Sequence, residues 1–327
     1  MKPDVVACLP LVLLFVAACS VTAAAPAAEP TPIGDVWWPS EWGADDERGA
    51  VNRLTPEKVL EAARLIRKGE SVSLGRIYES GMPIFGQRHY SLTMVGRPSS
   101  PVVGSNQAVW QEEVISGELA HLGTQLDGLG HVGVRMSGDD YLYNGLKLSE
   151  IGTPYGLTRL GIEKTGPFFT RGVLLDVARY KKTERLGIGY EITAADLEGA
   201  AREQGITVRP GDAVLIHTGH GSLWMVDNES YGNGAPGIGI EAAAWLAERK
   251  IALVGADTWG TEVAPSPRSG AVMDVHQYLI VRHGIYNVEN LDLAPLVSRG
   301  VHEFAFILSP LKLKGATGSP VNPIAVF

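Results

Sequence analysis

Short apolar runs recur along the chain, and glycine, proline or polar residues separate them. Four of these runs cover residues 173–177, 212–220, 251–255 and 304–308, and the second runs into a polar end. A short apolar run between turn-forming residues is typical of a buried strand. Each of the four is therefore predicted to form a β-strand.

Helix signals lie between the apolar runs. Thr55 followed by Pro56 predicts a helix that extends through Lys68. Residues 193–205 begin with the spacing of a capping box, and a further helix is expected over about residues 240–250. Strands that alternate with helices in this way predict an α/β protein.

The N-terminal pattern is of another kind. Lys2 precedes an apolar run over residues 5–18 that is too short for a stable transmembrane helix, and small residues follow it. Residues 1–28 are therefore predicted to be a signal segment. Two processing routes stay open, acylation at Cys19 as in a lipoprotein and simple cleavage within residues 23–28. By either route we expect an exported protein, periplasmic or extracellular, that contacts a membrane only through a lipid anchor.

Composition and charge narrow the remaining choices. Residues 29–36 are expected to be a tether and residues 37–327 a single domain. The net charge of −8 argues against nucleic acid or an anionic membrane as a partner. The expected partner is a small-molecule substrate. Both cysteines, Cys8 and Cys19, fall inside the predicted signal segment. Any metal ion must therefore be bound by His, Asp, Glu or Gln.

The densest candidate chemistry lies between His121 and His131, with Gln125 and Asp127 between them. Imidazole, carboxylate and amide groups separated by glycines are typical of a metal site. A straight strand would place His121 and Gln125 roughly 13 Å apart, too far for one ion, and a regular helix would separate the outer groups. A turn at residues 123–124 is therefore expected, since glycine permits it. A glycine-rich surface loop without a function is the alternative.

The same stretch resembles the signature of the metal-dependent cyclase family, which includes bacterial kynurenine formamidase and isatin hydrolase. The matching positions are His121, Gly123, Thr124, Asp127 and His131. Gln125 departs from the pattern, because the family has histidine there. The resemblance covers residues 37–327 and implies a swivelling β/β/α fold, with a mixed sheet and flanking helices. It also implies a homo-oligomer, a dimer or a tetramer.

The resemblance assigns roles to these residues. It implies one divalent metal ion, Mn or Zn, bound by His121 and Asp127. Gln125 would be a weaker ligand because its oxygen is neutral, which makes a second metal ion less secure. His131 would be the general acid and base.

The family's second block, a histidine followed by Glu-Asn-Leu, is matched by His276 and residues 289–291. A helix that ends at Gly284 and turns back as a strand would bring Glu289 near His276. By resemblance, these two side chains complete the metal shell or position the water, with His276 taken as a ligand and Glu289 as a catalytic group.

Four further residues are candidates for the substrate pocket. Trp42 lies in an N-terminal run similar to another family motif, and His217 lies at the polar end of a predicted strand. Asp257 and Trp259 follow the strand over residues 251–255. For Asp257 the commoner alternative is an aspartate that caps a turn.

These residues predict a metal-dependent hydrolase, and the family resemblance implies an amidohydrolase of the kynurenine formamidase-like type. It would cleave an amide, lactam or lactone bond, C–N other than peptide or C–O, in a small cyclic or aromatic substrate by metal-activated water. Neither a Gly-x-Ser-x-Gly motif nor a phosphate-binding glycine loop is present. A metal-dependent cyclase or dehydratase, and a non-catalytic exported binding protein with the same fold, are the alternatives.

Overall fold

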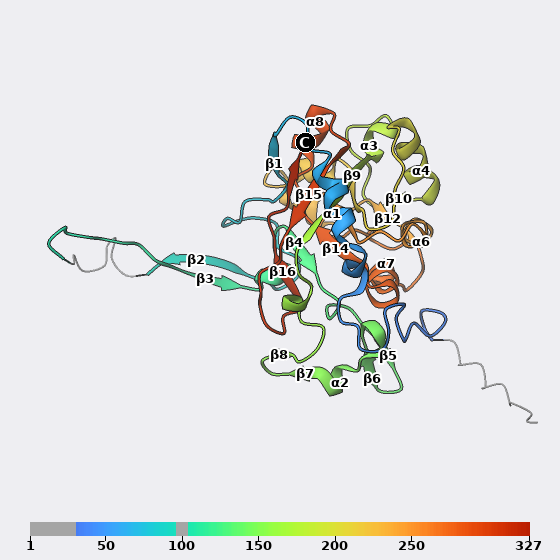
Figure 1. Cartoon of the computed structure of the whole chain (residues 1–327), viewed down its shortest axis with the longest axis horizontal. Helices are drawn as coiled ribbons and strands as arrows, with labels where there is room; N and C mark the ends of the chain where they lie inside the picture. The colour runs from blue at the N-terminus through green and yellow to red at the C-terminus, as the bar shows by residue number, and fades with distance from the viewer. Residues whose placement is uncertain (1–30, 96–103) are drawn as a thin grey trace, which may run out of the picture.

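The computed structural model describes residues 31–95 and 104–327, so the predicted signal segment with Cys19 lies outside the described residues. Within them a nine-stranded mixed sheet runs through the molecule (Figure 1). Its strands in spatial order are β1 (Ser71–Ser73), β17 (Ile324–Val326), β15 (Glu303–Leu308), β9 (Phe168–Asp176), β11 (Ala213–His217), β13 (Leu253–Ala256), β14 (Tyr286–Glu289), β4 (Gln125–Asp127) and β16 (Gly318–Pro320). Strands β9, β11, β13 and β14 are parallel, and the other neighbours pair antiparallel. The structure is the mixed α/β fold with flanking helices that the sequence predicts.

The central strands are buried on both faces, which explains why their sequences are continuously apolar. In β9, Val173 and Leu175 pack into the core on one face of the sheet, while Leu174 packs into the core on the other. The same alternation holds in β11, where Val214 and Leu215 belong to opposite cores. Side chains alternate because successive residues of a strand point to opposite faces.

Helices flank the sheet (Figure 1). The described α-helices are α1 (Pro56–Ala63), α2 (Leu148–Ile151), α3 (Val177–Tyr180), α4 (Ala194–Glu203), α5 (Asn228–Gly232), α6 (Ile240–Glu248), α7 (Asp274–His276) and α8 (Ala294–Arg299). Apolar residues of α4 and α6, Leu197 and Leu246 among them, belong to the same core as Val173. None of the described helices has the length and apolar character of a membrane span.

Helix α1 is shorter than predicted. It begins at Pro56, with Thr55 as N-cap, but it ends at Ala63 and not at Lys68. The backbone N–H groups of Lys68 and Glu70 both donate to the Phe327 carbonyl oxygen, at 3.2 Å each. The chain therefore leaves the helix to pair with the C-terminal segment.

The remaining strands form four small pairs. They are β2 (Tyr90–Met94) with β3 (Glu113–Gly117), β5 (Val134–Met136) with β6 (Asp139–Tyr141), β7 (Gly152–Thr153) with β8 (Gly156–Leu157), and β10 (Glu191–Ile192) with β12 (Gly237–Ile238). The β2–β3 hairpin projects from the body of the molecule (Figure 1).

Part of the expected tether contacts the body of the molecule. The Arg282 guanidinium donates to the Ile33 carbonyl oxygen, and the Ile33 side chain packs beside Trp37. Within this segment, Ile33 therefore has a partner for its backbone carbonyl and another for its apolar side chain.

Candidate metal centre

The central motif begins in a 3-10 helix, Leu119–His121, and continues into β4, which lies between β14 and β16 in the sheet. The chain turns at Gly123, whose φ is +53°. A Cβ there would lie 2.8 Å from two ring carbons of Tyr78, so only glycine fits this approach. The Thr124 hydroxyl then donates to the Asn290 carbonyl oxygen at 2.8 Å. The turn predicted at residues 123–124 is confirmed, and it leads Gln125 and Asp127 into the sheet.

This turn gives a first testable prediction. Gly123→Ala should lower the free energy of unfolding of the metal-free protein by about 1–3 kcal/mol, because alanine meets both the positive φ and the Tyr78 ring. The control is Gly69→Ala, where φ is +71° and nothing lies within 4 Å of the added Cβ. Urea denaturation should show the larger loss at Gly123, and equal losses would contradict the role of the Tyr78 contact.

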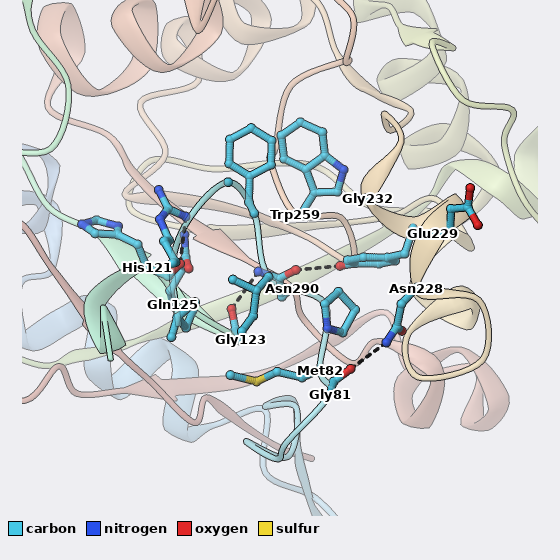
Figure 2. Close-up of a pocket in the computed structure, with 17 residues that line it drawn as sticks. Gly81, Met82, His121, Gly123, Gln125, Asn228, Glu229, Gly232, Trp259 and Asn290 are labelled. Atoms are coloured by element: carbon cyan, nitrogen blue, oxygen red, sulfur yellow. Dashed lines mark hydrogen bonds between the residues drawn. The ribbon is translucent and has the colours of Figure 1, made fainter. Parts of the chain in front are cut away.

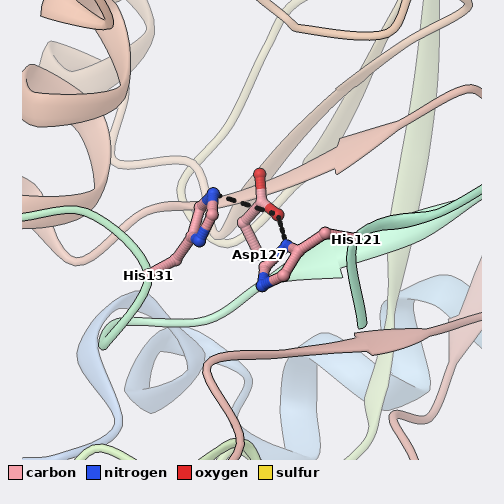
Figure 3. A group of neighbouring side chains, drawn as sticks. All are labelled: His121, Asp127 and His131. Atoms are coloured by element: carbon pink, nitrogen blue, oxygen red, sulfur yellow. Dashed lines mark ion pairs between the residues drawn. The ribbon is translucent and has the colours of Figure 1, made fainter. Parts of the chain in front are cut away.

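Asp127 is the centre of the site. Its carboxylate is fully buried, with Oδ1 at 3.3 Å from His121 Nδ1 and at 3.9 Å from His131 Nε2 (Figure 3). Oδ2 lies 3.6 Å from His276 Nε2. Within the described residues, neither Asp127 oxygen nor His121 Nδ1 has a hydrogen-bond partner. Buried polar atoms normally have one, so these three atoms fit the coordination of a cation.

A second group of donors shares Asp127. His276 lies in α7, and a π-helix over Gln277–Arg282 leads back to β14, at whose end Glu289 lies. His276 Nε2 is 3.0 Å from Glu289 Oε1, so the predicted approach of these residues is confirmed. Donor atoms of Asp127, His276 and Glu289 lie within 4.8 Å of one another, as do those of Asp127, His121 and His131. Imidazole and carboxylate donors in this arrangement fit a divalent ion.

Gln125 and Glu262 support the second group. Gln125 pairs with Glu289 across β4 and β14, and its Nε2 donates to Glu289 Oε2 at 2.9 Å. Glu262 Oε1 lies 2.7 Å from His276 Nδ1, and Glu262 Oε2 accepts from the Val275 N–H at 2.9 Å. A carboxylate on the second ring nitrogen fixes the orientation of a ligating histidine.

The electrostatics of the site follow from burial and close charges. Burial raises the pKa of Glu289 to about 7, and the Asp127 carboxylate adds to the rise. Burial lowers the pKa of His131 to about 4, so this imidazole is neutral at pH 7. Burial alone would raise the pKa of Asp127, but the surrounding imidazoles hold it well below its usual range. Burial opposes the rise in the pKa of His276, which the Glu262, Asp127 and Glu289 carboxylates nevertheless hold well above its ordinary value.

A cavity of about 500 Å³ opens over the motif (Figure 2). Trp259 lines it, with its ring stacked on Phe85 at a centroid distance of 4.8 Å. Tyr231 donates to Asn290 Oδ1 at 2.6 Å, and Asn290 Nδ2 donates to the Gly123 carbonyl oxygen at 2.7 Å. The lining residues come from a loop over 81–88, the central motif, α5 and the ends of β13 and β14. The cavity is therefore walled by aromatic rings and reaches His121 and Gln125.

Three predicted pocket residues lie elsewhere. Trp42 packs against the core that contains Val173, with the Arg53 guanidinium 4.9 Å from its ring. His217 Nδ1 is 2.7 Å from Asp176 Oδ1, at the end of β11. Asp257 accepts the backbone N–H groups of residues 218 and 219 at 2.9 and 3.0 Å, so it holds a turn. Trp42, His217 and Asp257 therefore do not line this cavity, whereas Trp259 does.

Sequence reasoning missed the loop over 81–88, which supplies Phe85 and Arg88 to the cavity. The Arg88 NH1 group donates to the His121 carbonyl oxygen at 2.9 Å, which brings this loop to the motif. The one signal in the sequence is an aromatic residue between glycine and proline residues, in Gly81-Met82-Pro83-Ile84-Phe85-Gly86. Such a loop is common, and its partner is 33 positions away along the chain.

The protein thus has a mixed α/β fold with a candidate metal site, in which carboxylates and imidazoles lie buried beside a cavity. Residues 72–263 match the family model described as "Putative cyclase". A protein whose solved structure is described as "Crystal structure of a novel cyclase" has 36% sequence identity to this chain. The two structures align with a TM-score of 0.79 over 88% of this chain and 96% of that one. The protein belongs to the cyclase family.

Two other solved structures are similar at lower identity. Isatin hydrolase A from Ralstonia solanacearum is 21% identical with a TM-score of 0.59, over 83% of this chain and 97% of that one. A "predicted metal-dependent hydrolase" from Bacillus stearothermophilus is 19% identical with a TM-score of 0.51, over 78% and 97%. At these identities the likeness shows the fold alone. No curated protein matches the chain.

Proposed function

We propose that this protein is a metal-dependent hydrolase that cleaves an amide, lactam or lactone bond in a small cyclic or aromatic molecule. The observation that carries the proposal is the buried Asp127 carboxylate, whose unpartnered oxygens face three imidazoles beside the cavity. The stacked rings of Phe85 and Trp259 support a planar substrate. The names of the similar structures, isatin hydrolase and metal-dependent hydrolase, agree with this reaction class.

The proposed metal ion is Mn or Zn, bound by His121 and Asp127, with His276 as a further ligand. Such an ion would polarise the substrate carbonyl and supply hydroxide near neutral pH. His131, neutral at pH 7, takes the proton of the attacking water and returns it to the leaving nitrogen or oxygen as the bond to carbon breaks. Glu289, which is hydrogen-bonded to His276 and Gln125, orients the water or completes the ligand set.

The test is to measure metal content and product formation together. The purified protein is incubated with Mn²⁺ or Zn²⁺, freed of excess metal, and analysed for bound ion. Formamides, lactams and lactones of aromatic compounds are then offered, and the products are identified by mass. The proposal expects about one bound ion per chain. A cyclic substrate should give one product that is heavier by one water, and an open-chain substrate should give two products. Loss of water from a substrate would instead identify a cyclase or dehydratase.

Glu262 gives a second prediction. Glu262→Gln should weaken metal binding or activity by about 10–100-fold, because His276 loses the carboxylate that orients its ring. The matched control is Glu241→Gln, an exposed glutamate in the first turn of α6. Metal affinity is measured by competition with a chromogenic chelator. Unchanged affinity and activity in Glu262→Gln would remove His276 from the functional site.

A homo-oligomer, a dimer or tetramer, is part of the proposal. The projecting β2–β3 hairpin exposes large apolar side chains, among them Leu92, Trp110 and Val114. A two-stranded hairpin is marginally stable in water, and exposed apolar surface marks interaction sites. Export through residues 1–28 is likewise proposed, from the sequence pattern. Light scattering and the N-terminal sequence of the secreted protein test the two statements.

A further inference from the structure

Arg88 carries a positive charge to the cavity wall next to the candidate metal centre. Its NH1 group donates to the His121 carbonyl oxygen at 2.9 Å, and its guanidinium lies 5.9 Å from the Phe85 ring centroid. The side chain is half-buried and lines the cavity. The guanidinium is therefore held in place by contacts that leave most of its N–H groups unused.

Among the described residues, no carboxylate oxygen lies within 4.0 Å of an Arg88 guanidinium nitrogen. Other arginines of the chain are paired, for example Arg76 with Asp292 at 3.7 Å and Arg209 with Glu61 at 2.9 Å. The planar guanidinium binds a carboxylate through two parallel hydrogen bonds, which is the strong geometry for this side chain. An unpaired arginine in the wall of a cavity is thus suited to an anionic group of the ligand.

The charge balance of the site favours an anion as well. Asp127 and Glu289 are two buried carboxylates of the candidate metal centre, beside the cavity residues His121 and Gln125, and one divalent ion would balance their charge. His276 is paired with Glu262 at 2.7 Å. Arg88 is then a surplus positive charge at the wall. The acidic residue that lines the cavity, Glu229, is exposed on α5 and lies across the cavity from His121 (Figure 2).

We propose that Arg88 is an anion-binding residue of the cavity and that the substrate carries a carboxylate. The inference rests on the proposed hydrolase function for its substrate. Because Arg88 contacts the backbone of His121, the bound carboxylate and the reacting carbonyl belong to neighbouring positions of one small molecule. Phe85 and Trp259 bind the planar part of that molecule.

The alternative is that Arg88 only holds His121 in place through its carbonyl oxygen. Two variants separate these roles. Arg88→Gln retains an amide donor but has no charge, and Arg88→Lys retains the charge without the planar fork. The control is Arg67→Gln, which removes an exposed arginine outside the cavity. Metal content is measured for every variant, since a role confined to His121 would reduce it.

The first measurement is calorimetric binding of benzoate and of its neutral analogue benzamide to the Zn²⁺-loaded and Mn²⁺-loaded full-length protein. The proposal expects Arg88→Gln to bind benzoate about 10–100-fold more weakly than the parent, with metal content and benzamide affinity retained. Arg88→Lys should lie between them, and Arg67→Gln should match the parent. Unchanged benzoate affinity in Arg88→Gln, or loss of metal from it, would overturn the proposal.

The second measurement compares hydrolysis of 2-formamidobenzoate with that of formanilide, which lacks the carboxylate. The parent should prefer the anionic substrate in kcat/KM, and Arg88→Gln should lose about tenfold or more of that preference. Benzoate binding that depends on Arg88, without hydrolysis of either formamide, would support the anion site and count against the proposed hydrolase. Equal preference in the parent and Arg88→Gln would overturn the anion site and leave the hydrolase standing.

Discussion

Asp127→Ala should lose the metal ion and the activity together. The Asp127 carboxylate is shared by both groups of donors. Its Oδ1 faces two imidazoles and its Oδ2 faces one, and neither oxygen has a hydrogen-bond partner among the described residues. Its removal leaves the first group with two imidazoles and no carboxylate, and the second with Glu289 as its one carboxylate. Elemental analysis should find little metal in the variant after incubation with Mn²⁺ or Zn²⁺, and turnover should fall to background.

The same substitution should have little effect on the stability of the metal-free protein. A fully buried carboxylate without hydrogen-bond partners destabilises a fold, so its replacement should not lower the free energy of unfolding by much. Added metal should stabilise the parent by about 4 kcal/mol at a thousandfold excess over Kd and leave the variant unchanged. Thermal unfolding with and without metal checks this.

Asp176→Asn is the control for Asp127. Asp176 is also buried beside a histidine, with Oδ1 at 2.7 Å from His217 Nδ1, but it lies at the ends of β9 and β11 away from the motif. The Asp176→Asn variant should therefore retain the metal ion, even if the substitution lowers its stability. Full metal occupancy in Asp127→Ala, or equal loss of metal in both variants, would show that the donor assignment is wrong.

The sequence predicted best those elements that one local rule specifies. The strands β9, β11, β13 and β15 lie where the apolar runs placed them. Helix α4 begins with the predicted capping box, in which Thr193 and Asp196 exchange hydrogen bonds. The end of α1 could not be predicted, because it depends on pairing with Phe327 at the other end of the chain.

The same contrast holds for the site. Residues 121–131 run from the end of a 3-10 helix through β4 into the turn that follows, so their proximity depends on the local sequence. His217 lies at the end of a strand, as predicted, but that strand, β11, is separated from β4 by β13 and β14. Three strand spacings of about 4.8 Å place such an end roughly 14 Å from the motif. Strand order, which the sequence does not state, therefore decides which polar ends face the site.

Gln125 shows what the register of the sheet adds. From sequence alone it is a weak metal ligand in the place of a histidine. In the structure β4 pairs with β14 so that Gln125 is opposite Glu289, and the amide donates to that carboxylate. An imidazole nitrogen that ligates an ion could not make this bond with the same atom. Gln125 therefore acts on Glu289 through its amide N–H, a role that the sequence alone does not indicate.

His131→Ala should leave the metal bound and lower turnover by a factor on the order of 100 or more. Burial lowers the pKa of His131 to about 4, so at pH 7 its imidazole is free to accept a proton. Its Nε2 lies 3.9 Å from Asp127 Oδ1, and its ring stacks on His121 at a centroid distance of 4.1 Å. This position is adjacent to the candidate ligands, where a base can reach a water molecule bound at the centre.

The same geometry also admits His131 as a third ligand with His121 and Asp127, and the variant distinguishes the two roles. A general base is lost without loss of metal, whereas a ligand takes the ion with it. His89→Ala is the control, because that histidine is exposed at the base of the β2–β3 hairpin. Metal content and single-turnover rates are measured for both. Loss of metal from His131→Ala would make His131 a ligand and leave Glu289, whose pKa is raised to about 7, as the remaining candidate for proton transfer.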